Sequence, residues 1–195
     1  MIVDLDDFGA NHVISDQCQS HDCRDLLDKL HYANPKFKVT LFAIPAEMTI
    51  EMLDWCRANK TWVELAVHGW KHTDNYEASK WDENTMLGVI NHPLVQEYFV
   101  KGFKAPGWQI SDGCYEALLE GDWWVADQAY NNDRRLAELR AYVNYDGKFF
   151  VANDQVDAWH GHTWNCMGNG IEETFPQLLE KVKQATDFQF ISELF

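Results

Sequence analysis

The chain has 195 residues and a formal net charge of −15, because 31 Asp plus Glu face only 16 Lys plus Arg. This charge repels nucleic acid and anionic membrane surfaces, so neither is an expected partner. Hydrophobic residues make up 46% and charged residues 24%, as in ordinary globular proteins, which excludes collagenous and disordered classes and favours one domain over 1–195.

Short apolar segments that lead into polar turns predict β-strands. In chain order they are 1–5, 38–44, 62–67, 102–105, 123–127, 148–152 and 156–160. Segments with apolar residues at helical spacing predict helices between and after them, at 23–33, 49–59, 91–100, 111–121 and 171–184. Thr49 and Ser111 stand where N-cap residues belong.

The alternation of strands and helices predicts an α/β protein with a parallel sheet. The sequence contains no GxGxxG or GxxxxGK[ST] turn, which argues against an open nucleotide-binding sheet. We therefore expect a distorted (β/α) barrel with about seven parallel strands, one for each predicted segment.

The five cysteines, an odd number with no CxxC pair, favour free thiols in a reducing compartment over a disulfide framework or a thiolate zinc site. No signal-peptide pattern and no long apolar run is present. We expect a cytoplasmic location; a viral or phage origin would also fit. The oligomeric state is left open.

Polar side chains collect where the predicted strands end. They are Asp6 and Asp7, His68 and His72 in AVHGWKHT, Lys104 in GFKAPGW, and His160 and His162 in WHGHTWN. The C-terminal ends of parallel barrel strands converge on one face, so these side chains are expected to be neighbours. One carboxylate and two histidines leave coordination positions open, which is typical of a catalytic metal site. The other carboxylate of the first strand, Asp4, is expected to be satisfied by backbone donors.

Several segments match known motifs in order. LDDFG, HGWKH and GFKAPGW are similar to T-F-D-D-G, H-[ST]-x-x-H and F-R-x-P-G, with VTLFAIP and YEALLEGDWWVADQ in the intervening places. HGHTWN is similar to W-G-H-S-Y-E, a form of the last motif that elsewhere reads L-x-L-H. Over nearly its whole length the chain thus resembles the polysaccharide deacetylases with a NodB-homology domain.

The resemblance implies a metal site with an adjacent base. Asp7, His68 and His72 would bind one divalent metal, zinc in the first place, with cobalt, nickel, manganese or iron as alternatives. Asp6 would be the general base that activates a water at the metal. Gly69 stands where that family has Ser or Thr, so a hydroxyl that could support the metal site is missing.

The resemblance also implies an acid and an oxyanion donor. His162 would protonate the leaving amine by alignment with W-G-H-S-Y-E, whereas alignment with L-x-L-H selects His160. A backbone N–H at Gly107 or Trp108 would hold the oxyanion. Lys104 stands where the family has an arginine that orients the base, which keeps the charge but loses the planar fork.

The expected function is a metal-dependent hydrolase that removes an N-acetyl group from an N-acetylated sugar or glycan. One alternative is a related C–N hydrolase acting on a cyclic amide or ureide. Another is a catalytically silent carbohydrate-binding protein, which the nine tryptophans would suit because indoles stack on sugar faces. A purely structural metal site is a third reading, and it would be expected to close with a fourth protein ligand.

Overall fold

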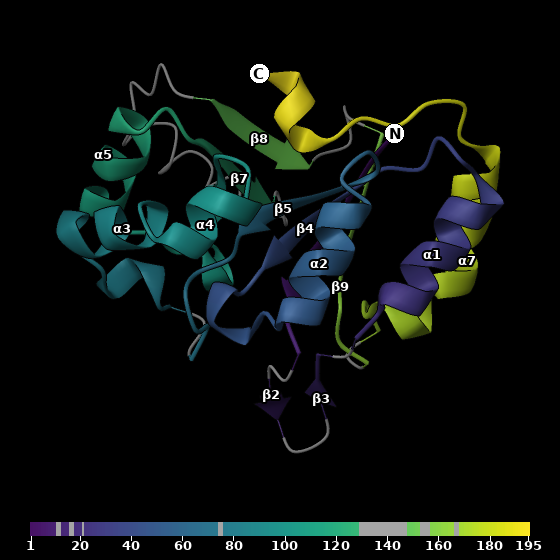
Figure 1. Cartoon of the computed structure of the whole chain (residues 1–195), viewed down its shortest axis with the longest axis horizontal. Coiled ribbons are helices and arrows are strands. Elements are labelled where there is room, and N and C mark those ends of the chain that lie inside the picture. The colour runs from purple at the N-terminus through teal and green to yellow at the C-terminus, as the bar shows by residue number, and fades with distance from the viewer. Residues whose placement is uncertain are drawn as a thin grey trace.

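One curled sheet of seven parallel strands forms the centre of the molecule (Figure 1), in the order β8, β7, β6, β5, β4, β1, β9. The computed structural model describes residues 1–10, 13–15, 18–20, 22–73, 76–128, 148–152, 157–165 and 168–195. The strands are β1 (Ile2–Phe8), β4 (Val39–Ala43), β5 (Val63–Val67), β6 (Gly102–Lys104), β7 (Trp124–Gln128), β8 (Phe149–Ala152) and β9 (Ala158–His162). The predicted α/β class, barrel-like sheet and strand positions are confirmed.

Helices cover the outer face of the sheet in two groups. Figure 1 shows α1 and α7 side by side on one flank and α3, α4 and α5 on the other, with α2 between them. Their bounds are α1 (Arg24–Ala33), α2 (Ile50–Ala58), α3 (Glu83–Ile90), α4 (Pro93–Tyr98), α5 (Asp112–Glu120) and α7 (Ile171–Gln184). The hydroxyls of Thr49 and Ser111 cap α2 and α5 as expected. The helix α3 was not predicted.

The side chains of β1 alternate between the two faces of the sheet. Val3 and Leu5 pack in the outer apolar cluster beneath the helices, whereas Ile2 packs inside the curl of the sheet. Because successive strand residues point to opposite faces, Asp4 and Asp6 share the inner face with Ile2. The interior is therefore apolar at the start of the strands and charged near their C-terminal ends.

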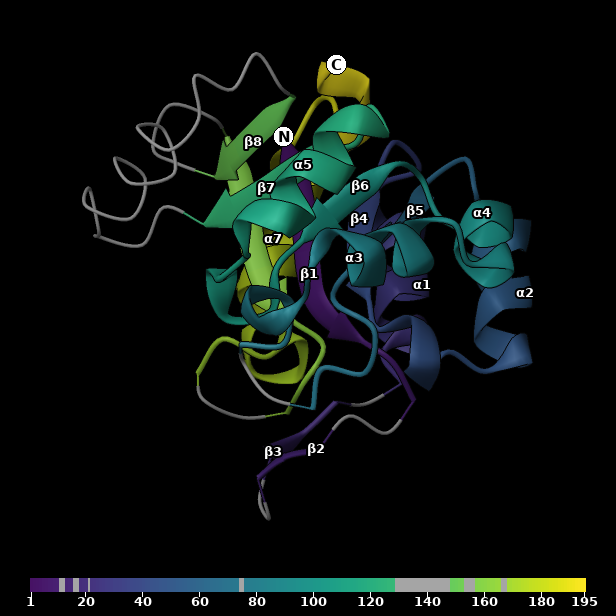
Figure 2. The same cartoon turned by 90° about the vertical axis from the view of Figure 1, so that its left-hand side faces the viewer.

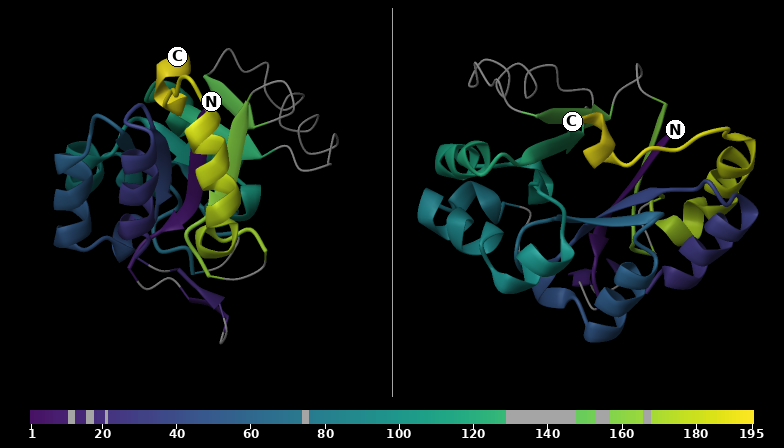
Figure 3. Two further views of the ribbon diagram at one scale, coloured as in Figure 1. Left: turned by 90° about the vertical axis from the view of Figure 1, so that its right-hand side faces the viewer. Right: turned by 45° about the horizontal axis from the view of Figure 1, so that its top comes forward.

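The last residues of the chain close the N-terminal end of the barrel. A short 3-10 turn, η4 (Ile191–Leu194), lies across this end near the chain's first residue (Figure 3). Buried Glu64 on β5 accepts hydrogen bonds from the Thr40 hydroxyl, at 2.6 Å, and from the Ser192 hydroxyl. The carboxyl group of Glu64 thus ties the C-terminal turn to the sheet.

A small antiparallel hairpin, β2 (Val13–Ser15) and β3 (Cys18–Gln19), projects from the opposite end (Figure 2). It was not predicted, and neither were the 3-10 turns η1 (Pro45–Glu47), η2 (Ala78–Lys80) and η3 (Pro106–Trp108). Within the described ranges, no helix has the length and apolar character needed to cross a membrane.

Three cysteines are free and buried, as expected: Cys23, Cys56 and Cys114. The Cys18 side chain and Cys166 lie outside what the structure describes. The tryptophans divide between core and margin. Trp62, Trp123 and Trp124 are buried, and the other six are half-buried.

Candidate active site

The predicted site residues meet at the C-terminal ends of four strands, β1, β5, β6 and β9. The structure brings together seven of them, nearly all buried: Asp6, Asp7, His68, His72, Lys104, His160 and His162. Asp4, which was not predicted to belong to the site, joins them. They form two adjoining groups, one around the carboxylate of Asp7 and one around that of Asp6.

The Asp7 group has the geometry of a cation site. Asp7 Oδ1 lies 3.4 Å from His68 Nε2 and 3.3 Å from His72 Nε2. This buried oxygen accepts no hydrogen bond from the described part of the chain. His68 Nδ1 lies 2.9 Å from the carbonyl oxygen of Lys104, so Nδ1 carries a proton and Nε2 is the ring nitrogen that faces Asp7. These three residues fit a divalent metal.

The backbone at Asp7 explains why two consecutive residues serve the same site. In a regular strand Asp6 and Asp7 would point to opposite faces. The β1–β4 register is irregular between Leu5 and Phe8, and Asp7 adopts a left-handed φ of 64°. The Thr163 hydroxyl donates to the Asp7 carbonyl at 2.7 Å. A bulge with this added support turns Asp7 toward the side chain of Asp6.

Lys104 bridges the two carboxylates of the second group. Its Nζ lies 2.9 Å from Asp6 Oδ1 and 3.1 Å from Asp4 Oδ1. Burial alone would raise the pKa of both carboxyls and lower that of Lys104, but their mutual attraction outweighs it. The pKa values of Asp4 and Asp6 are therefore lowered and that of Lys104 is raised.

The prediction for Asp4 was wrong. Its side chain is held by Lys104 and by His160 Nδ1, at 2.7 Å, rather than by backbone donors. The two-residue spacing from Asp6 within one strand could have placed Asp4 on the same face. The sequence offers no comparable signal for the support that Thr163 gives to the backbone at Asp7.

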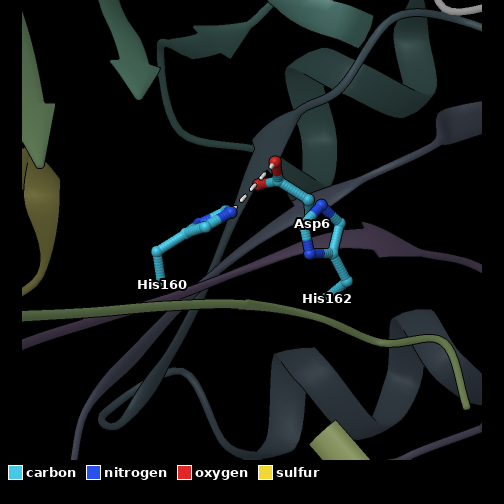
Figure 4. Close-up of side chains that lie close together, drawn as sticks. All are labelled: Asp6, His160 and His162. Carbon is cyan, nitrogen blue, oxygen red and sulfur yellow. Dashed lines mark ion pairs between the residues drawn. The ribbon is translucent and has the colours of Figure 1, made fainter. Parts of the chain in front are cut away.

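Two histidines of β9 face the Asp6 carboxylate (Figure 4), with His160 Nε2 at 3.9 Å from Asp6 Oδ2. The ring of His162 stacks on Trp164 with centroids 3.8 Å apart. His160 Nε2 and His162 Nδ1 are buried and have no hydrogen-bond partner among the described residues. Burial lowers the pKa of His162 to about 4, although the charge of Asp6 opposes this shift.

The buried charges distinguish the two groups as metal sites. Asp6, His160 and His162 lie close enough to offer ligands to an ion, as do the residues of the Asp7 group. However, the ammonium of Lys104 lies 2.9 Å from Asp6 Oδ1 and would repel a cation bound there, whereas Asp7 pairs with His68 and His72. Three buried carboxylates and one ammonium leave two negative charges, which a single divalent cation would balance. The Asp7 group is therefore the better candidate for the metal.

The turn after β6 carries the predicted oxyanion donors. Gly107 and Trp108 both have left-handed backbone conformations, with φ of 58° and 56°. The Trp108 N–H donates to the carbonyl of Ala105 at 2.9 Å, so in this structure it closes the turn. The role of either N–H toward an oxyanion stays a prediction.

No protein-family model and no curated protein sequence matches the chain. Among solved structures, the Xyl-CE4 domain of a multidomain xylanase from the hindgut metagenome of Trinervitermes trinervoides is similar, with a TM-score of 0.58 and 20% identity. The match covers 100% of this chain and 88% of that one.

Two further structures are similar over most of both chains. For a family 4 acetyl xylan esterase from Clostridium thermocellum with a cobalt ion, the TM-score is 0.55, the identity 16% and the coverage 100% and 89%. For the chitin deacetylase of the fungal pathogen Colletotrichum lindemuthianum, the values are 0.57, 12%, and 98% and 85%. This likeness confirms the resemblance stated from the motifs: the chain has the fold of the family 4 carbohydrate esterases.

Proposed function

We propose that this protein is a metal-dependent hydrolase that removes an acetyl group from a carbohydrate, with the amide of an N-acetylated sugar or glycan as the bond broken. The proposal rests on one observation: Asp7, His68 and His72 converge beside a second carboxylate, Asp6, which is paired with Lys104. The names of similar structures, an acetyl xylan esterase and a chitin deacetylase, support an acetylated polysaccharide as the substrate class.

Asp7, His68 and His72 would hold one divalent metal, zinc in the first place. When bound, the metal would lower the pKa of a water from 15.7 toward about 7 and polarise the acyl carbonyl. Asp6 would take the proton of the attacking water. Lys104, 2.9 Å from Asp6 Oδ1, keeps that carboxylate ionised and oriented for this task.

The leaving amine must be protonated, and two histidines are candidates for this role. The sequence motif favours His162, whereas the hydrogen bond to Asp4 favours His160, because it directs His160 Nε2 toward Asp6. We propose His160 as the acid, with His162 as the alternative. The N–H of Gly107 or Trp108 is proposed as the oxyanion donor by resemblance.

Two of the three alternative readings do not explain the position of Asp6. A silent carbohydrate-binding protein has no need for a buried carboxylate held beside a metal site by an ammonium group, and a structural metal site would recruit it as a ligand. Hydrolysis of a cyclic amide or ureide would use the same residues. It is therefore distinguished only by the choice of substrate.

The first test is the metal content of the purified protein by elemental analysis. We expect about one divalent metal per chain, lost in the His68→Ala, His72→Ala variant and kept in a His31→Ala control, since the His31 ring stacks on Trp62 outside the site. Acetate release would then be measured on chitooligosaccharides and on acetylated xylooligosaccharides. A wild type that takes up neither zinc nor cobalt would contradict the proposal.

A further inference from the structure

Glu77, a carboxylate outside the two groups, accepts hydrogen bonds from the backbone of the loop that carries His72. Glu77 lies directly before η2, and its Oε2 accepts the N–H groups of Trp70 and His72 at 3.1 and 2.8 Å. Its Oε1 accepts the N–H of Lys71 at 3.1 Å. Three consecutive backbone donors thus converge on one side chain, and donors to an ionised carboxylate make stronger hydrogen bonds than donors to a neutral acceptor.

The backbone held in this way is in an unfavourable conformation. His72 has a left-handed φ of 51°, which a residue with a side chain adopts only when its surroundings enforce it. The N–H of His72 makes the shortest of the three bonds to Glu77. Glu77 is therefore placed to enforce the conformation that brings the imidazole of His72 to Asp7.

Gly69 leaves the space that this arrangement needs. Its φ is 71°, and a Cβ at this position would lie 2.5 Å from Glu77 Oε2 and 2.7 Å from Cγ of Pro106. A side chain at residue 69 would displace the carboxylate. Gly69 thus lacks the Ser or Thr hydroxyl of the motif, and the Glu77 carboxylate supports the loop instead.

We infer that Glu77 is a positioning residue that holds the loop of residues 70–72 and so places His72 for metal binding. The inference rests on the proposed function, in which His72 is a metal ligand. Glu77 acts through the backbone and does not itself reach the metal. Groups that orient a ligand in this way typically change metal affinity by about 10–100-fold when they are removed.

The test compares Glu77→Ala and Glu77→Gln with the wild type, and uses Glu116→Gln on the exposed face of α5 as a control for lost charge. The first measurement is amide hydrogen exchange of residues 70–72 in the metal-free protein. We expect exchange in Glu77→Ala to be about tenfold faster or more, with the rest of the sheet unchanged. Glu77→Gln keeps one acceptor oxygen and should lie between Glu77→Ala and the wild type.

The second measurement is cobalt affinity, by competition with a chromophoric chelator. We expect affinity to fall by about 10–100-fold in Glu77→Ala and to stay unchanged in Glu116→Gln. Unchanged exchange at residues 70–72, or equal cobalt affinity in Glu77→Ala and wild type, would overturn the inference alone. A wild type that binds no cobalt would overturn the proposed function, while the exchange data would still decide whether Glu77 holds the loop.

Discussion

His160 donates its Nδ1–H to the carboxylate of Asp4 across the β1–β9 ladder, where the two residues are direct neighbours in register and the two atoms lie 2.7 Å apart. The lowered pKa of Asp4 keeps it ionised, so the ring nitrogen must be the donor. This assigns the opposite nitrogen, Nε2, to the site and leads to a test that separates the two candidate acids.

We expect His160→Gln to lower the rate of amide deacetylation by about 10²–10⁴-fold, as for the loss of a general acid. Hydrolysis of an aryl acetate should fall much less, because an aryloxide leaves without being protonated. The two rates would be measured in parallel for His160→Gln and His162→Gln. If His162→Gln alone shows the amide-selective loss, the sequence-based assignment of the acid to His162 is the correct one.

Asp6 and Asp7 are adjacent in the chain, but we expect their replacement to have different effects on metal content and turnover. Asp6→Asn should lose about 10²–10⁴-fold in turnover and keep its metal, because it removes a base and no ligand. Asp7→Asn should lose its metal, because it removes a proposed ligand. Elemental analysis and acetate release on the same preparations check both statements. Equal metal loss in the two variants would show that Asp6 is a ligand.

Replacing Lys104 leaves Asp4 and Asp6 buried without their shared cation. Lys104→Met is therefore expected to lower the free energy of unfolding by about 3–5 kcal/mol, the usual cost of breaking a buried pair. Urea denaturation of the metal-free protein at neutral pH measures this. Lys29→Met, exposed on α1, is the matched control and should change it by less than about 0.5 kcal/mol.

Glu64 predicts a pH dependence far from the site. Burial raises the pKa of this carboxyl above its ordinary value of 4.5, and the negative charge of Glu193 adds to the rise. The hydrogen bonds from Ser192 and Thr40 oppose it. A carboxyl whose pKa is raised by folding stabilises the fold at low pH and loses that contribution as pH rises through the folded value.

Glu64→Gln should therefore flatten the fall in stability between about pH 4.5 and neutrality, since an amide does not ionise. Thermal unfolding followed across this range is the measurement. Glu116→Gln, exposed on α5, should keep the wild-type profile. If the stability of Glu64→Gln depended on pH as that of the wild type does, the raised pKa of Glu64 would be contradicted.

The sequence predicted the strands because their apolar runs are short and end in polar turns. It did not predict α3, although Asp82 caps that helix and Met86, Val89 and Ile90 lie on its buried side. The β2–β3 hairpin is too short for any periodicity to be read. In α3 the apolar residues fill only about two turns, so the helical spacing is short, and packing against the core adds to the weak local signal.

Some features of the site were likewise predictable from the sequence, and others were not. Motif spacing indicated Asp6, Asp7 and the four histidines, because their neighbours in the chain are distinctive. The partners of Asp4 depend on the β1–β9 register and on where Lys104 enters the barrel, and neither can be derived from local sequence. Glu77 is an ordinary acidic residue in a polar stretch, and only the folded loop shows what it binds.

The place of β1 between β4 and β9 has a consequence for folding. Asp7, His68 and His72 all lie within the first 72 residues, whereas the contact from Asp4 to His160 joins positions 156 residues apart. Contacts between distant segments carry a larger loop-closure cost and tend to form later. We expect a refolding chain to bring these three residues together before the candidate proton donor joins them, so that the two halves of the site form in separate kinetic events.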